Sequence, residues 1–222
     1  ILSFFKMKIT AVVPVYNEEK TIDNILKTLV SSEKISSVIV VDNGSTDNTP
    51  NILKRHKINK VKIITLKKPI GKGNAIKIGT KNINSDILLF FDADLIGLKE
   101  SHIDKLLNPI MGKNAFMVIG LRDKENFIAN MIMPYFPLIG GERAIFTRDF
   151  MKIRENPFIN GWGLESVMNN YYKKKKLKVV KVKLDGMNHI GLQTKKSGLT
   201  AFLKQIYDVT STKIKLLNIK HY

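Results

Sequence analysis

Strand-like apolar runs alternate with helix-like segments along the first part of the sequence, up to residue 95. The first run, Lys8–Val15, is rich in β-branched residues, and from Thr21 onward apolar residues recur at helical spacing. Thr49 and Pro50 are expected to supply the N-cap and the first-turn proline of a second helix. Further strands are expected at Val38–Val41, Val61–Leu66 and Ile87–Phe91, and a short helix at Asn74–Asn82. This alternation predicts an α/β fold with a doubly wound, mostly parallel sheet.

Past residue 95 the pattern is less regular, but helices and strands can still be assigned. Elements are expected at Ser101–Leu107 and Leu164–Lys174 (helices) and at Ala115–Gly120, Glu142–Thr147 and Lys178–Leu184 (strands). The last strand alternates Lys with Val or Leu, which is typical of a sheet edge with one face in water. A C-terminal amphipathic helix is expected at Gly198–Asn218. We therefore expect a single domain whose mostly parallel mixed sheet is flanked by helices, with residues 7–95 as one half and 96–222 as an extension.

The composition limits the classes of protein and of metal site that are open to the chain. With 222 residues and 44% hydrophobic content, the chain can bury the core of one α/β domain. The 37 Lys and Arg against 19 Asp and Glu give a net charge of +18, which attracts phosphates, nucleotides, nucleic acid or an anionic membrane. The chain has no cysteine. Disulfides and thiolate metal sites are thereby excluded, so any metal must be bound by oxygen or imidazole.

No membrane-spanning segment is visible in the sequence, because no stretch reaches the roughly 18 to 20 uncharged apolar residues that a spanning helix needs. Ile1–Lys6 is apolar but too short for a signal peptide, and we expect the domain to begin at Met7. A cytoplasmic protein is therefore expected. The basic run Lys173–Lys176 leaves peripheral contact with an anionic membrane open as an alternative to a solvated face. Formation of an oligomer is also left open.

Two carboxylates directly follow the fourth apolar run, in Phe90-Phe91-Asp92-Ala93-Asp94. Ligands of open α/β sheets bind at this C-terminal end of the strands. Alternate residues of an extended strand point the same way, so Asp92 and Asp94 would face one divalent ion together. If the backbone turns, they would divide between sugar and metal. Taken alone, the pair is also consistent with a solvated acidic turn.

Three more polar segments follow strands of the first half. They are Val13-Pro14-Val15-Tyr16-Asn17-Glu18-Glu19, Val41-Asp42-Asn43-Gly44-Ser45-Thr46-Asp47 and Gly71-Lys72-Gly73-Asn74. Asp42 could accept a hydrogen bond from a nucleobase N–H, and the flexible third segment lets Lys72 approach a phosphate at a helix N-terminus. Each segment alone is typical of a turn followed by a helix cap. Their common position at strand ends predicts one shared site.

These four segments, in this order, resemble the nucleotide-sugar half of family 2 and related GT-A glycosyltransferases. The resemblance spans about Ile9–Leu95 and implies a GT-A (Rossmann-like) fold, a nucleotide-sugar donor, and Mg²⁺ or Mn²⁺ as cofactor. It implies that Asp92 and Asp94 bind the metal and the diphosphate, with Asp94 as a catalytic residue, and that residues 7–95 form the nucleotide-sugar-binding half. The residues it assigns to the nucleotide sugar are Pro14, Tyr16, Glu18, Asp42, Asn43, Lys72 and Asp92.

Three segments of the second half resemble, more loosely, the glucosyl-3-phosphoglycerate synthase group. They are Gly140-Gly141-Glu142-Arg143-Ala144, Gly161-Trp162-Gly163-Leu164-Glu165 and Asp185-Gly186-Met187-Asn188-His189. In that group a late histidine completes the metal site, so His189 is the implied third protein ligand of the metal. The resemblance implies transfer of a hexose from a UDP- or GDP-sugar to a small acceptor that can carry a phosphate, such as a glycerate.

Five residues of the second half are expected on the acceptor side of the site. Glu165 is a candidate catalytic carboxylate that would take the acceptor proton if the reaction inverts, or orient sugar or acceptor if it retains. It could instead serve only to favour the dipole of its helix. Gly161 would allow close approach of a ligand, and Trp162 could stack on a sugar ring. Arg122 and Arg143 would suit a phosphate or carboxylate on the acceptor.

Three other functions stay open on the sequence alone. A polyprenyl-phosphate or other lipid-linked acceptor would keep the same chemistry and use the basic run Lys173–Lys176 at a membrane surface. A nucleotidyltransferase is disfavoured. Its glycine-rich signature is expected in the first strand–helix loop, where this chain has Pro14-Val15-Tyr16-Asn17-Glu18-Glu19 instead. A nucleic-acid-binding protein would explain the charge but not the strand-end segments, and no known nucleic-acid-binding signature is visible. We therefore expect no nucleic-acid partner.

Overall fold

The computed structural model describes residues 7–122, 140–160 and 163–190, together with Ser211. Its strands are β1 (Ile9–Val15), β2 (Ser37–Asp42), β3 (Val61–Thr65), β4 (Ile87–Phe90), β5 (Leu95–Ile96), β6 (Met117–Arg122), β7 (Arg143–Phe146), β8 (Val179–Leu184) and β9 (Asn188–His189). Its helices are α1 (Ile22–Ser31), α2 (Thr49–Arg55), α3 (Lys72–Gly79), α4 (Glu100–Met111), α6 (Thr147–Ile153), the 3-10 helix η1 (Pro157–Ile159) and α7 (Gly163–Lys174).

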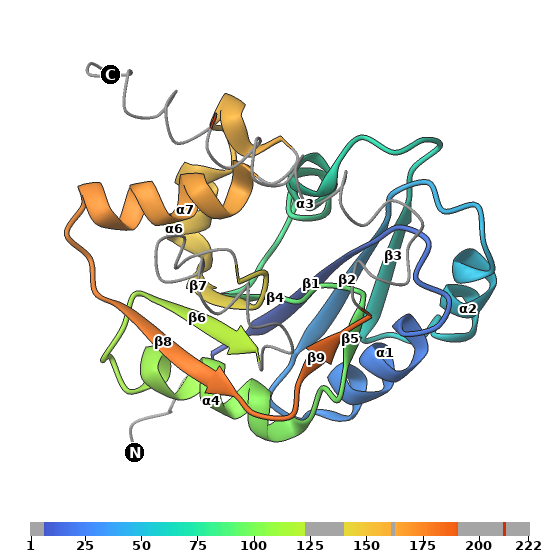
Figure 1. Cartoon of the computed structure of the whole chain (residues 1–222), viewed down its shortest axis with the longest axis horizontal. Helices are drawn as coiled ribbons and strands as arrows, with labels where there is room; N and C mark the ends of the chain where they lie inside the picture. The colour runs from blue at the N-terminus through green and yellow to red at the C-terminus, as the bar shows by residue number, and fades with distance from the viewer. Residues whose placement is uncertain (1–6, 123–139, 161–162, 191–210, 212–222) are drawn as a thin grey trace.

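Seven strands form one mixed sheet in the order β3-β2-β1-β4-β7-β6-β8 (Figure 1). Strand β1 pairs in parallel with β2 and β4, and β2 pairs in parallel with β3. Strand β7 runs antiparallel between β4 and β6, and β8 is a parallel edge strand beside β6. Both halves of the chain share this sheet. The predicted α/β class, with a single domain and a mostly parallel mixed sheet, is therefore confirmed.

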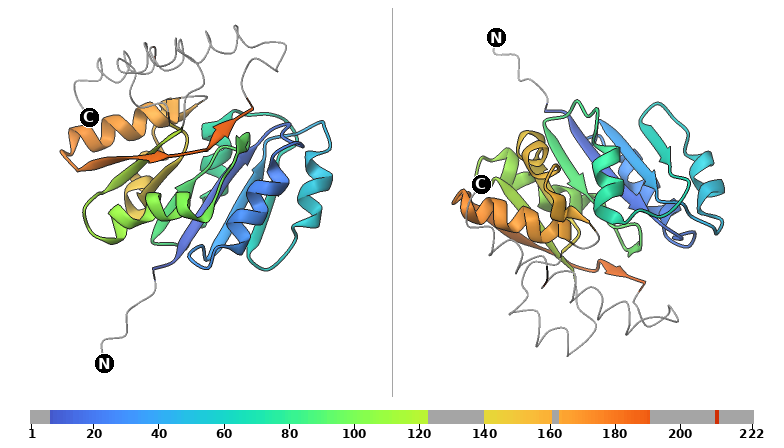
Figure 2. Two further views of the ribbon diagram at one scale, coloured as in Figure 1. Left: turned by 60° about the horizontal axis from the view of Figure 1, so that its bottom comes forward. Right: turned by 90° about the horizontal axis from the view of Figure 1, so that it is seen from above.

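Helices cover both faces of the sheet. Helices α1, α2 and α4 lie on one face and α3, α6 and α7 on the other (Figure 1 and Figure 2). Leu26 of α1 and Leu106 of α4 belong to the first hydrophobic core, and Phe150 of α6 belongs to the second. Because neighbouring strand residues face opposite sides, Leu89 of β4 enters the first core and Leu88 the second. None of the helices described here has the length and apolar character needed to cross a bilayer.

Pro14 marks the point where β1 and β4 part. Pairing between these strands ends at Val12 and Phe90, whereas β1 stays paired with β2 as far as Val15. The carbonyl of Val15 accepts from Asn43 N–H on the β2 side, so the backbone of Pro14 faces the β4 side, beyond the last pair. A proline is tolerated there because no ladder hydrogen bond needs its missing N–H. The strand ends separate at this switch point, which is where open α/β sheets bind ligands.

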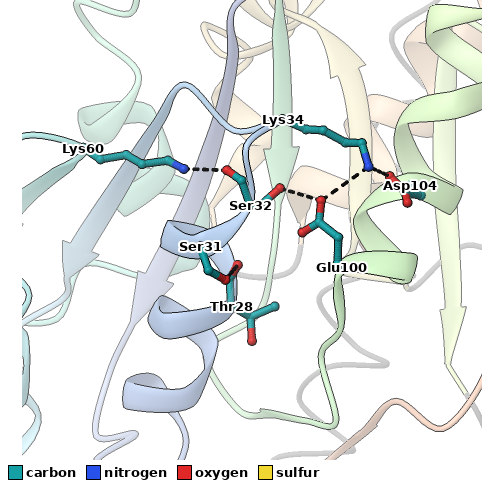
Figure 3. A network of polar contacts seen from close by, with 7 residues as sticks. All are labelled: Thr28, Ser31, Ser32, Lys34, Lys60, Glu100 and Asp104. Carbon is teal, nitrogen blue, oxygen red and sulfur yellow. Dashed lines mark hydrogen bonds and ion pairs between the residues drawn. The ribbon is translucent and has the colours of Figure 1, made fainter.

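A polar network ties the C-terminal end of α1 to the start of α4 (Figure 3). Lys60 Nζ donates to the carbonyl oxygens of Val30 at 2.7 Å and Ser32 at 2.6 Å. Carbonyls at a helix C-terminus lack intrahelical partners and favour a cation. Ser32 Oγ donates to Glu100 Oε1 at 2.8 Å, and Lys34 pairs with the same oxygen at 3.4 Å. The network anchors the end of α1 that lies away from the strand-end loops.

Several local predictions were wrong in detail. Thr49 does not cap α2 but is its first helical residue, and its buried hydroxyl accepts from Glu18 N–H at 2.9 Å. The helix expected at Asn74–Asn82 begins earlier, at Lys72, and ends at Gly79. Helix α6 was not predicted, because it follows β7 without any glycine, proline or asparagine to signal the change.

The N-terminal turn of α3 packs directly on the backbone of η1. Gly73 is buried, and a Cβ placed on it would lie 1.7 Å from the carbonyl oxygen of Ile159. Ile159 is itself fixed in the second hydrophobic core. Only glycine permits this approach, which brings the Lys72 end of α3 close to the segment that leads into α7.

We predict that Gly73→Ala lowers the free energy of unfolding by about 3 kcal/mol or more, because the added methyl overlaps fixed backbone. Chemical denaturation followed by circular dichroism measures the change. Gly112→Ala is the matched control, since its Cβ would lie 3.1 Å from Asn108 O at an ordinary φ of −75°. The control should change stability by less than about 1 kcal/mol. Equal effects of the two substitutions would contradict the packing described here.

Candidate active site

Segments from both halves of the chain meet at one rim of the sheet. The loops after β1, β2, β3 and β4 lie there because these strands are parallel. The antiparallel β7 begins at the same rim, where Arg143 pairs with Phe90 of β4 and Ile119 of β6. Strand β6 ends just beyond, at Arg122. In sheet order, polar side chains therefore follow the rim from Asp42 on β2 to Arg122 on β6.

Reciprocal hydrogen bonds join the loop after β1 to the loop after β2. Asn17 has a φ of 55°, a left-handed conformation that asparagine tolerates. Its N–H donates to Ser45 Oγ at 3.0 Å, and its Oδ1 accepts from Thr46 N–H at 2.8 Å. The neighbouring Glu18 N–H donates to Thr49. These bonds make one unit of the two loops, and the predicted nucleotide contacts Pro14, Tyr16 and Glu18 lie on it or directly before it.

Asp42 is an incompletely satisfied buried carboxylate in this unit. It has no exposed surface, and its Oδ1 accepts from Ser45 N–H at 2.9 Å. Within the described ranges its Oδ2 has no hydrogen-bond partner. The buried Asn43 accepts from Ile70 N–H at 2.9 Å, which ties the loop after β3 to the same unit. A buried acceptor oxygen of this kind suits an N–H donor from a ligand.

Lys72 joins the two halves of the site. It is the first residue of α3, after Gly71 with a φ of 89°. Its Nζ lies 2.6 Å from Asp92 Oδ1 and 2.7 Å from Glu165 Oε1. The three side chains are 19%, 15% and 5% exposed, respectively. Because Asp92 follows β4 and Glu165 lies in the first turn of α7, one ammonium connects elements that are far apart in the sequence.

The surroundings of this Lys72 bridge favour its charged state. Burial alone would raise the pKa of Asp92, but Lys72, Arg122 and His189 hold that pKa below its usual value. Burial alone would lower the pKa of Lys72, but Asp92 and Glu165 raise it above its usual value. Lys72 and Asp92 are therefore both ionised at neutral pH.

Gly141 makes room for the carboxylate of Asp92. A Cβ on Gly141 would lie 2.2 Å from Asp92 Oδ2 and 2.7 Å from Oδ1. Asp92 therefore lies directly against the backbone that leads into β7. On the other side, Thr21 Oγ1 donates to the carbonyl oxygen of Ala93 at 2.6 Å, which fixes the segment carrying Asp92 and Asp94 to the start of α1.

Asp94 directly precedes β5, whose Leu95 pairs with His189 of β9 in a small second sheet (Figure 1). His189 also lies close enough to Asp92 to act on its charge. In the part of the chain that is described, no group of three carboxylate or imidazole side chains is arranged so that it could bind a metal ion. Asp92 contacts Lys72 instead. The oxygen and imidazole donors of the predicted set do suit Mg²⁺ or Mn²⁺. The assignment of Asp92, Asp94 and His189 as metal ligands stays a prediction.

Glu142 is a buried residue at the rim to which sequence reasoning gave no role. It has no exposed surface, and its Oε2 lies 3.3 Å from Arg122 Nε. Burial raises the pKa of Glu142 to about 7, which the charge of Arg122 partly opposes. In the sequence, Glu142 lies directly before a buried strand in the Gly140-Gly141-Glu142-Arg143-Ala144 segment, which by itself assigns no role to the residue.

The remaining acceptor-side candidates differ in their placement. Arg122 lies on the rim, with a side chain 20% exposed. Arg143 is 1% exposed, and its guanidinium donates to Asn169 Oδ1 at 2.7 Å inside the fold. Burial lowers the pKa of Arg143 to about 10. This placement does not fit the predicted contact of Arg143 with an acceptor. Gly161, Trp162 and most of the predicted C-terminal helix lie outside the described residues.

We predict that Lys72→Met lowers the free energy of unfolding by about 3 kcal/mol at pH 7, because it leaves two buried carboxylates without their cation. The lowered pKa of Asp92 stabilises the wild type above the ordinary carboxyl pKa, and this contribution is lost on acidification. The difference between wild type and variant should therefore persist from neutral pH down to about pH 4 and narrow as the pH falls below that value. Urea unfolding at a series of pH values measures it.

Lys77→Met is the matched control for this experiment. Lys77 lies on the same helix and pairs with Glu155 at 2.7 Å, but both side chains are largely exposed. An exposed ion pair contributes less than about 1 kcal/mol. A Lys72→Met variant as stable as Lys77→Met at pH 7 would show that the Lys72 bridge does not stabilise the fold.

Comparison with known proteins connects this geometry to a family. The family model described as glycosyl transferase family 2 matches residues 10–178. An uncharacterized protein of Methanocaldococcus jannaschii is 33% identical over 197 residues, covering 77% of this chain and 84% of that protein. The 4,4'-diaponeurosporenoate glycosyltransferase of Staphylococcus aureus is 29% identical over 109 residues, covering 48% of this chain and only 29% of that enzyme.

Solved structures of a Mycobacterium tuberculosis enzyme share the fold. Glucosyl-3-phosphoglycerate synthase in complex with phosphoglyceric acid superposes with a TM-score of 0.78 at 20% identity, over 97% of this chain and 81% of that chain. The same enzyme with Mn²⁺, UDP-glucose and phosphoglyceric acid gives the same TM-score, identity and coverage. The predicted GT-A fold is confirmed. Because the family match includes all four strand-end segments and the Lys72 bridge, the chain belongs to glycosyl transferase family 2 and is a glycosyltransferase.

Proposed function

We propose that this glycosyltransferase moves a hexose from a nucleoside diphosphate sugar to a small phosphorylated acceptor such as a glycerate, with the help of Mg²⁺ or Mn²⁺. The observation that carries the proposal is the Lys72 bridge, which places Asp92 and Glu165 around one ammonium. Residues 7–95 form the donor side of the site around the Lys72 ammonium, and residues 96–222 form the acceptor side. Lys72 therefore lies where a leaving diphosphate and an incoming acceptor have to meet.

The donor nucleotide is assigned to the joined loops after β1, β2 and β3. The open Oδ2 of Asp42 would accept from a base N–H, and the loops carrying Tyr16 and Asn43 would enclose the nucleoside. Tyr16 is 44% exposed, so its ring is accessible for stacking on a base or sugar. The UDP and UDP-glucose in the Mycobacterium tuberculosis structures favour uridine over guanosine as the nucleoside of the donor.

The divalent cation is assigned to Asp92, Asp94 and His189. Its fit is supported by their oxygen and imidazole donors and by the β5–β9 pairing, in which His189 lies opposite Leu95, the residue after Asp94. When bound, such a cation neutralises the charge that develops on the departing diphosphate. Lys72 Nζ supplies a second positive charge in the same region, already oriented by its two carboxylates, so little reorganisation is needed during the reaction.

Glu165 is the proposed catalytic carboxylate on the acceptor side. Its Oε1 accepts from Lys72, whereas its buried Oε2 has no partner among the described residues. That oxygen can accept a hydrogen bond from the acceptor hydroxyl and orient it toward the sugar. Gly161 and Trp162, which directly precede α7, are proposed to complete this side of the site.

A lipid-linked acceptor is a second candidate that depends on the basic run Lys173–Lys176. The four lysines are exposed and lie at the C-terminal end of α7, whereas Glu165 lies in its first turn. A helix of 12 residues is about 18 Å long, so the run lies roughly one helix length from the proposed catalytic group. This separation favours the small acceptor, and liposome flotation at moderate salt distinguishes the two.

We predict that UDP-glucose with Mn²⁺ raises the melting temperature more than either component alone. A ligand at about 100 times its dissociation constant stabilises a protein by about 2.7 kcal/mol. A thermal-shift panel of UDP-, GDP- and other nucleotide sugars measures the effect. Inorganic pyrophosphate is the control, because a chain with net charge +18 attracts any polyanion. If no nucleotide sugar exceeds pyrophosphate, the donor assignment is wrong.

We also predict that Asp94→Ala loses transfer activity by roughly 100-fold or more while its melting temperature stays close to that of the wild type. The physical reason is that the variant lacks a proposed metal ligand at the diphosphate. Transfer is measured with UDP-glucose, Mn²⁺ and 3-phosphoglycerate. Asp23→Ala, which removes a partly exposed carboxylate paired with Lys27 and His56, controls for general charge effects. Full activity of Asp94→Ala in the presence of chelator would refute metal-dependent transfer.

A further inference from the structure

Glu142 is a fully buried carboxylate that none of the assignments above uses. Within the described ranges neither of its side-chain oxygens accepts a hydrogen bond, and its ion-pair partner is Arg122, whose Nε lies 3.3 Å away. Its backbone carbonyl accepts from Gly120 N–H at 2.8 Å, which places the residue at the start of the β6–β7 ladder. The backbone of Glu142 is therefore fixed, and its buried carboxylate lies beside Arg122, the last residue of β6.

Such a carboxylate is costly to keep for stability alone. Desolvation of a buried charge costs several kcal/mol, and a single contact without hydrogen bonds repays only part of that cost. The pKa of Glu142, raised by burial to about 7, reflects the same cost. An apolar residue of similar volume would stabilise this position at least as well. The carboxylate is therefore better explained by what it does to Arg122.

Arg122 ends β6 at the same rim, on the side of β4 opposite to the nucleotide loops. Burial alone would lower its pKa, but the charges of Glu142, Asp92 and Asp94 raise that pKa above its usual value. In the sheet order, β6 is the second strand beyond β4 on the side away from β1 and β2. Neighbouring strands are about 4.8 Å apart, which puts Arg122 about 10 Å along the rim from Asp92. A substrate extending past the diphosphate would reach it.

We propose that Glu142 is a positioning residue that fixes the Arg122 guanidinium so that its terminal nitrogens bind the phosphate or carboxylate of the acceptor. The contact with Glu142 is made by Nε, one of the five N–H donors of the guanidinium. The two terminal nitrogens keep the forked arrangement that binds an oxyanion through two hydrogen bonds. Holding the long side chain in place beforehand lowers the entropy lost when the acceptor binds. The inference rests on the proposed function and names the group that recognises the acceptor's charge.

The test compares Glu142→Leu, Glu142→Gln, Arg122→Gln and the double variant Arg122→Gln with Glu142→Leu. The probe is 3-phosphoglycerate, titrated by calorimetry into protein saturated with UDP and Mn²⁺. We expect Glu142→Leu to weaken its binding about 10-fold and Glu142→Gln to lie between, while the dissociation constant for UDP changes less than about twofold. The double variant should bind no more weakly than Arg122→Gln alone, because Glu142 acts through Arg122.

The melting temperature of Glu142→Leu distinguishes a positioning role of Glu142 from a purely structural one. Glu142→Leu should melt at or above the wild-type temperature, and Glu155→Gln, which removes a surface carboxylate, should leave both affinities unchanged. A lower melting temperature with unchanged 3-phosphoglycerate affinity, or additive losses in the double variant, would overturn the proposal. So would a wild type that binds UDP but not 3-phosphoglycerate. A wild type that fails to bind UDP with Mn²⁺ would instead refute the proposed function itself.

Discussion

The ammonium of Lys72 lies between two carboxylates from opposite halves of the chain, and the geometry of the site depends on that contact. Without the cation, Asp92 and Glu165 would be like charges in a poorly hydrated setting, where repulsion is stronger than in water. With it, the end of β4 and the first turn of α7 are held together before any substrate arrives. The same charge lies where the departing diphosphate is proposed to be, so the contact that organises the rim would also serve the reaction.

Two close backbone approaches make this contact possible. Gly73 lets the start of α3 meet η1, and Gly141 lets the carboxylate of Asp92 lie against the strand that enters from the second half. The antiparallel course of β7 adds the third condition, because it returns the chain to the rim where β4 ends. The outcome is a row of polar groups that runs from Asp42 through Asp92 to Arg122, in the order nucleotide, diphosphate and acceptor that the proposed substrates require.

The features that the sequence predicted are those encoded locally. Apolar runs and the turns after them predicted the parallel strands, and the position of Asp42, Lys72 and Asp92 behind those strands predicted their common rim. The burial of Arg143 and the contact between Lys72 and Glu165 could not be predicted, because both depend on distances between elements far apart in the chain. Glu142 belongs to the Gly140-Gly141-Glu142-Arg143-Ala144 segment, but its role could not be predicted, because its burial and its contact with Arg122 depend on residues that are distant in the chain.

The most direct test of the shared site is a crystal structure grown with UDP and Mn²⁺, with the metal located by its anomalous signal. We predict one manganese peak bound by Asp92 and Asp94 and by diphosphate oxygens, with the base against Asp42 and Lys72 beside the phosphates. A manganese bound elsewhere, or a nucleotide that lies away from Asp42 while its diphosphate avoids Lys72, would contradict the claim that these loops form a single donor site.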